Sequence, residues 1–310
     1  VSCVATDNQN PAVSSCPSDI SVNVDAGNCF AVVNYSQPVF SDNCDGTGLS
    51  GIRTAGPASG SNFPVGVTTI TYTYTDEAGN GPVSCSFTIT VIDNENPVLN
   101  LPAAAPVQCA GDIPVPYPNY AALTAAGGSA SDNCALATAT FSFVNDVTDG
   151  SSCPETITRT YSIQDAAGNS TSAVQLIIVH DNTAPTASNP APVSVQCISD
   201  VPAPDVSVVS DEADNCSATP VVTHQGDANN GGSGCAGDPY IVTRTYRITD
   251  DCGNFTDVSQ TITAVDNTAP TASNPAPISV QCISDVPAPD STVVRDEAEN
   301  CTSTRVVTHQ

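Results

Sequence analysis

The sequence predicts an all-β protein made of tandem β-sandwich repeats of about 85 residues each. Three observations predict this class: a linker string that recurs at regular spacing, short segments in which apolar and polar residues alternate, and turn-forming residues between those segments. At 310 residues the chain is also too long for a single sandwich of about 100 residues.

The repeat is marked by four strings of the pattern DNxxP, whose leading residues are spaced by 86, 88 and 85 positions: Asp7, Asp93, Asp181 and Asp266. A second pattern, DxxGN, precedes three of these strings, and residues 183–225 match residues 268–310 at 35 of 43 positions. We therefore expect the end of a preceding repeat in residues 1–10, a first repeat in 11–96, a second in 97–184, a third in 185–269 and the first part of a fourth in 270–310. A chain divided in this way is expected to belong to a longer polypeptide.

Each repeat should consist of half-buried antiparallel strands, because its apolar residues recur at every second position. The pattern is seen in ISVNV (residues 20–24), TITYTY (69–74), SFTITVI (86–92) and TRTYRIT (243–249). The 25 Pro and 20 Gly residues leave no long amphipathic helix. DxxGN predicts a turn in which Gly takes a positive φ.

The charge balance is strongly acidic, with 32 Asp and Glu residues against 6 Arg and no Lys. This argues against nucleic acid and anionic membrane as partners. No apolar run reaches the roughly 18 residues of a membrane span, and the first residues lack a signal peptide, so we expect no direct membrane insertion by this segment. The lack of Lys also excludes Lys–Asn isopeptide crosslinks.

Fourteen Cys residues without a CxxC pair predict disulfides and an oxidising, extracellular setting. We expect the pairing that recurs in every repeat to be Cys16 with Cys44, Cys109 with Cys134, Cys197 with Cys216, and Cys282 with Cys301. Cys153 and Cys235 are expected to bridge to the next repeat, with Cys252 a candidate partner for Cys153, and Cys29 with Cys85 is the remaining choice in the first repeat. The sequence alone leaves other pairings open.

The first repeat resembles the hyalin repeat, an Ig-like extracellular module. The resemblance covers nearly all of residues 11–96 and depends on CP, GNC, DNC, FPVG, the Tyr run, DxxGN and the closing strand CSFTITVID in that order. The later repeats keep DNC, TxTY, DxxGN and DNxxP but lack FPVG. The resemblance implies a disulfide-stapled, elongated array of Ig-like sandwiches.

The later repeats are also similar to those of giant surface proteins of Bacteroidota, including gliding-motility adhesins exported by type IX secretion. That similarity implies display at the cell surface and adhesion. Echinoderm hyalin-type proteins are the other candidate host of the module.

The acidic motifs are candidates for Ca²⁺ ligands, because Ca²⁺ takes 6 to 8 oxygen ligands and DNxxP is similar to the linker at which cadherins bind interdomain Ca²⁺. In an Ig-like sandwich, the DNC loop and the DxxGN turn should meet the linker of the preceding repeat. At the junction of the first and second repeats the expected ligands are Asp93, Asn94, Glu95, Asp132, Asn133 and Asp165. At the next junction they are Asp181, Asn182, Asp211, Glu212, Asp214, Asp250 and Asp251, and Asp266 begins the linker after that. The alternative is that these residues only cap turns on a solvated surface.

No motif for catalysis is present, and His224 and His309 occupy one duplicated position, so we expect no enzyme activity and no organic cofactor. Two non-enzymatic classes stay open. The repeats form a stalk of an extracellular filament or surface adhesin, with the other repeats of the same long chain as partners, or they themselves bind a surface glycan or protein. Near-identical repeats favour the stalk.

Overall fold

The structure, a computed structural model, describes residues 6–301 and 306–308. The chain forms two compact units. The first comprises Val1–Ala105, Pro114–Asp149 and Thr156–Ile177, and the second comprises Pro106–Ile113, Gly150–Glu155 and Ile178–Gln310.

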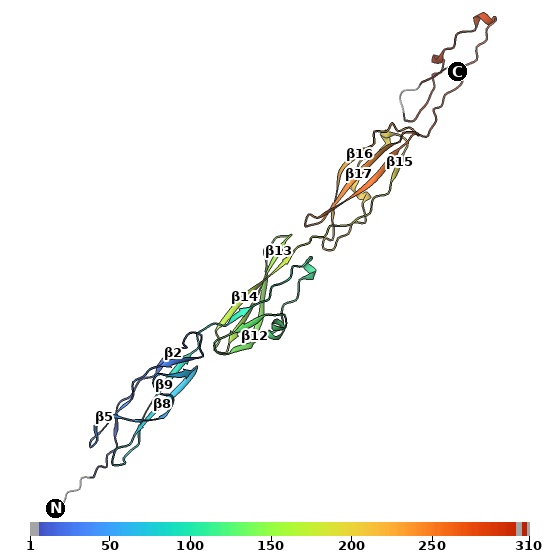
Figure 1. The fold of residues 1–310 in the computed structure, drawn as a ribbon. Coiled ribbons are helices and arrows are strands. Elements are labelled where there is room, and N and C mark those ends of the chain that lie inside the picture. The colour runs from blue at the N-terminus through green and yellow to red at the C-terminus, as the bar shows by residue number, and fades with distance from the viewer. Residues whose placement is uncertain (1–5, 302–305, 309–310) are drawn as a thin grey trace, which may run out of the picture. The chain divides into compact units, whose positions relative to one another are not determined.

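In the first unit, the first repeat folds into strands that form three sheets. The strand orders are β1-β4-β5, β2-β9-β8-β6 and β3-β7. The strands are β1 (Ala12–Ser15), β2 (Ile20–Asn23), β3 (Phe30–Val33), β4 (Val39–Asp42), β5 (Gly46–Ser50), β6 (Ile52–Ala55), β7 (Ser61–Pro64), β8 (Gly66–Tyr74) and β9 (Val83–Ile92). The two long strands β8 and β9 pair antiparallel, whereas the short β2 pairs parallel to β9 (Figure 1).

The alternating segments place one set of side chains in the core of this repeat. Every second residue of β9 from Cys85 to Val91 is buried, and in β8 the buried residues are Ile70 and Tyr72. They pack with Phe40 and Phe63 from the facing strands. Burial of these apolar groups provides the main stabilisation of the repeat.

The first unit also contains much of the second repeat, whose strands form a two-stranded sheet, β10-β11, and a three-stranded sheet, β12-β13-β14. A short helix, α1 (Tyr120–Ala125), buries Leu123 and starts at Asn119, whose side chain accepts a hydrogen bond from the Ala122 N–H at 2.9 Å. The strands are β10 (Val98–Asn100), β11 (Ser129–Ser131), β12 (Leu136–Thr148), β13 (Glu155–Asp165) and β14 (Ser170–Val179).

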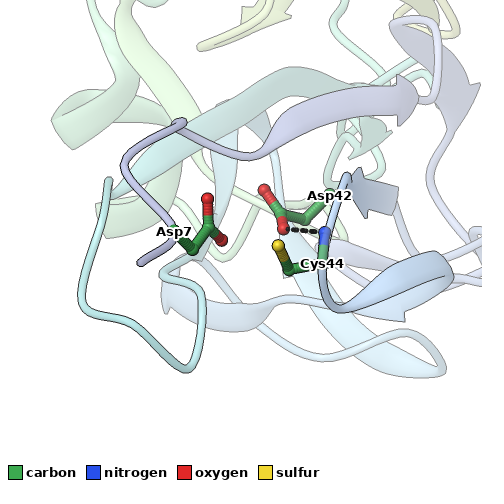
Figure 2. Close-up of side chains that lie close together, drawn as sticks. All are labelled: Asp7, Asp42 and Cys44. Carbon is green, nitrogen blue, oxygen red and sulfur yellow. Dashed lines mark hydrogen bonds between the residues drawn. The ribbon is translucent and has the colours of Figure 1, made fainter. Parts of the chain in front are cut away.

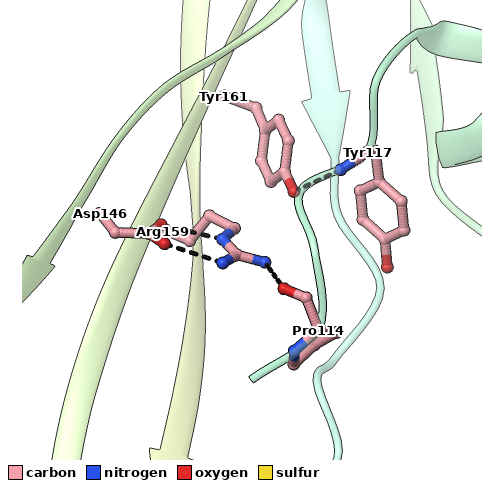
Figure 3. A network of polar contacts seen from close by, with 5 residues as sticks. All are labelled: Pro114, Tyr117, Asp146, Arg159 and Tyr161. Atoms are coloured by element: carbon pink, nitrogen blue, oxygen red, sulfur yellow. Dashed lines mark hydrogen bonds and ion pairs between the residues drawn. The ribbon is translucent and has the colours of Figure 1, made fainter. Parts of the chain in front are cut away.

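A buried arginine crosslinks this part of the molecule (Figure 3). The side chain of Arg159 is only 3% exposed and donates two hydrogen bonds of 2.8 Å to the carboxylate of Asp146. Its remaining amino group donates to the backbone carbonyl of Pro114 at 2.6 Å. Nearby, the hydroxyl of Tyr161 accepts from the Tyr117 N–H at 3.0 Å. The polar groups are therefore paired, as buried polar groups must be to avoid a desolvation cost.

The second unit contains one four-stranded sheet with the order β15-β18-β17-β16. The same Arg and Tyr positions recur on β17, where Arg244 forms two hydrogen bonds to Asp227 and Tyr246 is fully buried. The strands are β15 (Val193–Val195), β16 (Val221–Asn229), β17 (Tyr240–Thr249) and β18 (Phe255–Ala264). In the part of the chain that the structure describes, single turns of 3₁₀ helix occur at Ala110–Asp112, Ile198–Asp200, Val206–Val208, Ile283–Asp285 and Ser291–Val293.

The all-β class expected from the sequence is confirmed, with α1 and the 3₁₀ turns as the additions. The turn chemistry of DxxGN is confirmed as well, because its glycines Gly79, Gly168 and Gly253 have φ values of 91°, 97° and 88°. Within the described residues, no helix is long and apolar enough to span a membrane.

The disulfides differ from the expected pairing. The structure joins Cys16 to Cys85 within the first repeat, and four further pairs join one repeat to the next: Cys29–Cys134, Cys109–Cys216, Cys153–Cys252 and Cys197–Cys301. The expected pairs Cys16–Cys44, Cys109–Cys134, Cys197–Cys216 and Cys282–Cys301 are therefore wrong, as is Cys29–Cys85. The candidate pair Cys153–Cys252 is confirmed.

Strand direction explains the correction. Cys197 follows β15, whose last residue pairs with Ala264 at the end of β18. Cys216 precedes β16, whose first residue pairs with Thr249 at the opposite end of the sheet. A strand of ten residues spans about 33 Å, and no disulfide can bridge that length.

Candidate metal centres

Three clusters of acidic side chains repeat one arrangement at successive linkers. Each combines the leading Asp of DNxxP with the Asp and Cys of DNC, and candidate ligand atoms of each cluster lie within 4.8 Å of one another. The clusters are Asp7 with Asp42 and Cys44, Asp93 with Asp132 and Cys134, and Asp181 with Asp214 and Cys216. The first two lie in the first unit and the third lies in the second unit.

Local turns hold both carboxylates of each cluster in place. One oxygen of the linker Asp accepts the backbone N–H two residues later, as in the 3.0 Å bond from Thr183 to Asp181. One oxygen of the DNC Asp accepts the N–H of the Cys, as in the 2.8 Å bond from Cys44 to Asp42 (Figure 2). These are Asx turns, which Asp and Asn form readily at such positions.

The other carboxylate oxygens are left without a partner although they are buried. In the first and third clusters one oxygen of each Asp is affected, namely on Asp7, Asp42, Asp181 and Asp214. In the second cluster the affected atoms belong to Asp132 and to the neighbouring Asn133. The linker residues Asp93 and Asp181 are only 5% and 3% exposed. An unpaired buried carboxylate oxygen is costly, so each cluster has the electrostatics of a cation site.

Backbone hydrogen bonds favour the charged form of two of these carboxylates, Asp42 and Asp214. The N–H of Cys44 is the main cause of the lowered pKa of Asp42. Burial opposes ionisation of Asp214, but the N–H groups of Ser217 and Cys216 outweigh it and the pKa of Asp214 is also lowered. Two carboxylates so close together repel each other when both are ionised. Within the described ranges, no Arg or His forms an ion pair with any of the six cluster aspartates.

The sulfur atoms distinguish between classes of metal. Cys134 and Cys216 are in disulfides and cannot supply thiolates. Cys44 has a free thiol, and burial together with the charge of Asp7 raises its pKa, so the thiolate is disfavoured there. Oxygen ligands remain, and they suit a hard cation such as Ca²⁺ better than Zn²⁺. The residues of the clusters therefore fit Ca²⁺.

The DxxGN turn lies beside each cluster, and hydrogen bonds within the turn hold the side chain of its Asp. The carboxylate oxygens of Asp165 accept hydrogen bonds from the Gly168 and Asn169 N–H groups and from the Asn169 side chain. That side chain also donates to the backbone carbonyl of Asp93 at 3.2 Å. The turn thus fastens the linker backbone, and Asp250 with Asn254 repeats the arrangement at Asp181.

The remaining expected ligands lie outside the three clusters. Glu95 accepts a hydrogen bond from the Gly27 N–H at 2.8 Å, and Asn182 exchanges hydrogen bonds with the side chain of Gln108. Asn94 is exposed, and Asp211 accepts the Ser188 N–H. Glu212 has a buried unpartnered oxygen, Asp251 borders a cavity beside Asp181, and Asp266 accepts the Thr268 N–H.

The sequence reasoning missed the first cluster. Asp7 and Asp42 belong to the same DNxxP and DNC motifs as the predicted ligands, so the motifs alone contained the signal. It also missed the two amides, Asn169 and Asn254, that connect each turn to its linker.

Comparison with known proteins gives the setting of these repeats. Residues 6–91 match the family model of the HYR domain. Hyalin of Lytechinus variegatus is 31% identical over 280 residues, which are 87% of this chain and 48% of that protein. Hyalin of Strongylocentrotus purpuratus is 28% identical over 310 residues, which are 91% of this chain and 22% of that protein. The chain therefore spans half or less of the length of these two relatives.

Solved structures of cadherin ectodomains are similar only at a low level. Extracellular domains 1–5 of protocadherin gamma B2 match with a TM-score of 0.31 and 12% identity, covering 84% of this chain and 61% of that one. Domains 22–24 of mouse cadherin-23 match with a TM-score of 0.29 and 11% identity, covering 84% of this chain and all of that one. The sequence matches, by contrast, support a hyalin repeat in this chain, related to extracellular surface proteins and adhesion-type modules.

Proposed function

We propose that this chain is a non-enzymatic structural segment of an extracellular adhesive protein, and that Ca²⁺ joins its successive repeats at the three clusters. One observation carries the proposal: an unpartnered carboxylate oxygen occurs both on the linker Asp and on the DNC Asp that faces it. This is seen at Asp7 with Asp42 and again at Asp181 with Asp214. Turn capping accounts for one oxygen of each of these carboxylates and leaves the other without a role.

A bound Ca²⁺ would connect the end of one repeat to the DNC loop of the next. The two carboxylates would supply its charge, and backbone carbonyls and water would complete the 6 to 8 ligands. Neutralising the two facing carboxylates would remove their repulsion and hold the linker against the following repeat. A site with so few carboxylates should bind at about 10⁻⁴ to 10⁻³ M, the range of extracellular modules.

The role within a larger protein follows from the repeats. Similar modules in series provide length, and in this proposal they act as a stalk that carries adhesive parts located elsewhere in the polypeptide. Relatedness to hyalin supports an extracellular adhesive setting. Gliding motility, type IX export and a host among the Bacteroidota stay predictions of the sequence resemblance, as does direct binding of a glycan or protein ligand by the repeats.

Calorimetric titration with Ca²⁺ tests the proposal. The chain should bind about three ions, and replacing the DNC residue of every cluster, Asp42→Asn with Asp132→Asn and Asp214→Asn, should abolish the binding heat. A control with the same change of charge is Asp205→Asn with Asp211→Asn and Asp290→Asn, three exposed residues outside the clusters. Loss of binding in the control, or full binding in the triple cluster variant, would overturn the assignment.

A further inference from the structure

Three of the described cysteines carry exposed free thiols, Cys44, Cys235 and Cys282. Each lies at a position where the matching cysteines of neighbouring repeats form disulfides. The match holds in sequence motif, in backbone conformation and in surroundings.

Cys44 is the cysteine of DNC in the first repeat. The matching cysteines of the three following repeats, in DNC at Cys134 and Cys216 and in ENC at Cys301, are all bonded to a cysteine of the repeat before them: Cys134 to Cys29, Cys216 to Cys109 and Cys301 to Cys197. Cys44 also shares the local geometry, because its N–H donates to Asp42 at 2.8 Å as that of Cys134 does to Asp132. The position therefore faces the preceding repeat.

Cys282 is the cysteine of VQC in the fourth repeat. The other two, Cys109 and Cys197, are bonded to the cysteine of DNC (Cys216) or ENC (Cys301) in the repeat that follows. All three begin a 3₁₀ turn in an extended conformation, with φ and ψ of −116° and 156° at Cys109, −113° and 152° at Cys197, and −123° and 153° at Cys282. Cys282 therefore presents its sulfur from the same backbone geometry.

Cys235 in the third repeat matches Cys153 in the second. The sulfur of Cys153 lies 4.0 Å from the carbonyl oxygen of Asp181, the first residue of its linker. The backbone of Cys235 forms an isolated β-bridge with that of the equivalent residue, Asp266. The N–H of Asp266 donates to the Gly234 carbonyl at 2.7 Å. Cys153 is bonded to Cys252 in the DxxGN turn of the following repeat. In that turn the second repeat has Ala167, and the first repeat has no cysteine matching Cys153.

The surroundings of the two sulfurs correspond as well. Cys153 borders a cavity of about 200 Å³, whose lining includes Gln108, Cys109, Asp181 and Cys216. Cys235 borders a cavity of about 120 Å³ lined by the matching residues Gln196, Cys197, Asp266 and Cys301. The first cavity is also lined by Asp251 and Cys252, which belong to the DxxGN turn of the following repeat.

We propose that Cys44, Cys235 and Cys282 are open halves of disulfides that join this segment to flanking repeats of the same kind. Cys44 takes the cysteine of the repeat before it that has the role of Cys29 or Cys109, Cys282 takes the cysteine of DNC or ENC in the repeat after it, and Cys235 takes a cysteine in the DxxGN turn of a following repeat. Where that turn has Cys, as in DDCGN, two disulfides cross one junction, and where it has Ala, one disulfide does.

The reaction is thiol–disulfide exchange with a disulfide oxidant, such as oxidised glutathione or a protein disulfide. The thiolate of Cys235 attacks the oxidant, which releases one thiolate and leaves a mixed disulfide. The partner thiolate then attacks the sulfur of Cys235 and releases the second thiol of the oxidant. Two protein thiols lose two protons and two electrons, and one oxidant disulfide is reduced to two thiols.

An extended chain tests the proposal with this protein's own residues. Because Gln310 matches Gln225, a second copy of residues 226–310 can follow Gln310 in frame and continue the repeat pattern. The extension adds four cysteines, copies of Cys235, Cys252, Cys282 and Cys301. The extended chain is refolded with oxidised and reduced glutathione in the presence of EDTA, and its disulfides are mapped by mass spectrometry of non-reduced peptides. EDTA keeps the result independent of Ca²⁺ and hence of the proposed function.

The expected result is that the original Cys235 pairs with the copied Cys252 and the original Cys282 pairs with the copied Cys301. The thiols of Cys44 and of the copied Cys235 and Cys282 stay free, and the five present disulfides stay intact. A matched variant with Ser in place of the copied Cys252 should free Cys235 alone. The proposal is overturned if Cys235 or Cys282 stays free in the extended chain or pairs otherwise, or if Cys44 pairs with Cys3 in the original chain.

Discussion

The side-chain amide of Asn254 donates a hydrogen bond of 3.1 Å to the backbone carbonyl of Asp181, seventy-three residues earlier in the chain. The same amide donates to the carboxylate of Asp250 at 2.7 Å. One residue of a turn motif that recurs in this chain thus connects its own turn to the linker that precedes the repeat. Asn169 makes the same contact with Asp93. The asparagine of DxxGN serves the junction as well as the hairpin.

Replacing this asparagine should loosen one linker and leave the strands intact. In Asn169→Ala the carbonyl of Asp93 and the carboxylate of Asp165 each lose a donor, at a cost of about 1 to 2 kcal/mol. Hydrogen exchange at residues 93–97 should become faster, with no change in the strand β8 of the first repeat. Equal protection of the linker in the variant and the original chain would argue against the role assigned to Asn169.

The substitution Asp132→Asn should have effects of opposite sign with and without Ca²⁺. In EGTA it removes one of two facing charges at the second cluster and should raise the Tm of the first unit by about 2 to 5 °C. In millimolar Ca²⁺ it removes a ligand and should lower Tm relative to the original chain. Scanning calorimetry in both buffers checks this, with Asp211→Asn as the control. The same sign of change in both buffers would contradict a cation site.

The buried arginine pair should be sensitive to removal of one partner. Arg159→Ala leaves Asp146 and the Pro114 carbonyl without their donor and should cost about 2 to 3 kcal/mol in free energy of unfolding. The first repeat has the apolar Ile70 at this position, fully buried. The double change Arg159→Ile with Asp146→Val should therefore recover most of the loss. Urea denaturation measures both, and Arg247→Ala, at a half-exposed pair, is the control with little effect.

Acid should weaken the matching pair in the second unit. The hydrogen bonds from Arg244 are the main reason why the pKa of Asp227 is lowered to about 2. Because the pKa of Asp227 is lower in the folded chain than the value of about 3.9 in the unfolded chain, the pair stabilises the fold fully above pH 3.9. This stabilisation is lost as the pH falls toward the folded pKa of about 2. The contribution is about 1 to 2 kcal/mol after allowance for solvent screening. The difference in unfolding free energy between the original chain and Asp227→Asn should shrink as the pH falls below 4. A constant difference down to pH 2 would disprove this.

The junction disulfides should contribute to stability in a way that free thiols do not. The double change Cys29→Ala with Cys134→Ala opens a loop with a sequence separation of 105 residues and should cost about 2 to 4 kcal/mol. Cys44→Ala removes an exposed free thiol and should leave the unfolding free energy unchanged. Chemical denaturation under non-reducing conditions compares the two. A loss in Cys44→Ala as large as in the double variant would contradict the assignment of a free thiol to Cys44.

The sequence by itself determined the class of fold and the punctuation of the chain. Alternation along residues 69–74 and 86–92 requires a strand with one buried face, because only a period of two places every second side chain on the same side. The glycine of DxxGN likewise dictates its own turn, since Gly79 and its equivalents adopt a positive φ that other residues avoid. These are local consequences of residue type and spacing, so they can be read without coordinates.

The tertiary structure decided which distant groups meet. The first and last ends of a long strand are about 33 Å apart, so Cys197 and Cys216 cannot pair although only nineteen positions separate them in sequence. Cys197 pairs instead with Cys301, at a sequence separation of 104. In the same way, both carboxylate oxygens of Asp165 accept hydrogen bonds within their own turn. Asp7 and Asp42, which belong to separate motifs, lie close together in the folded chain. The spacing of residues within one strand determines which side chains share a face. The partner of a cysteine in the next repeat depends instead on how the folded chain brings the two repeats together.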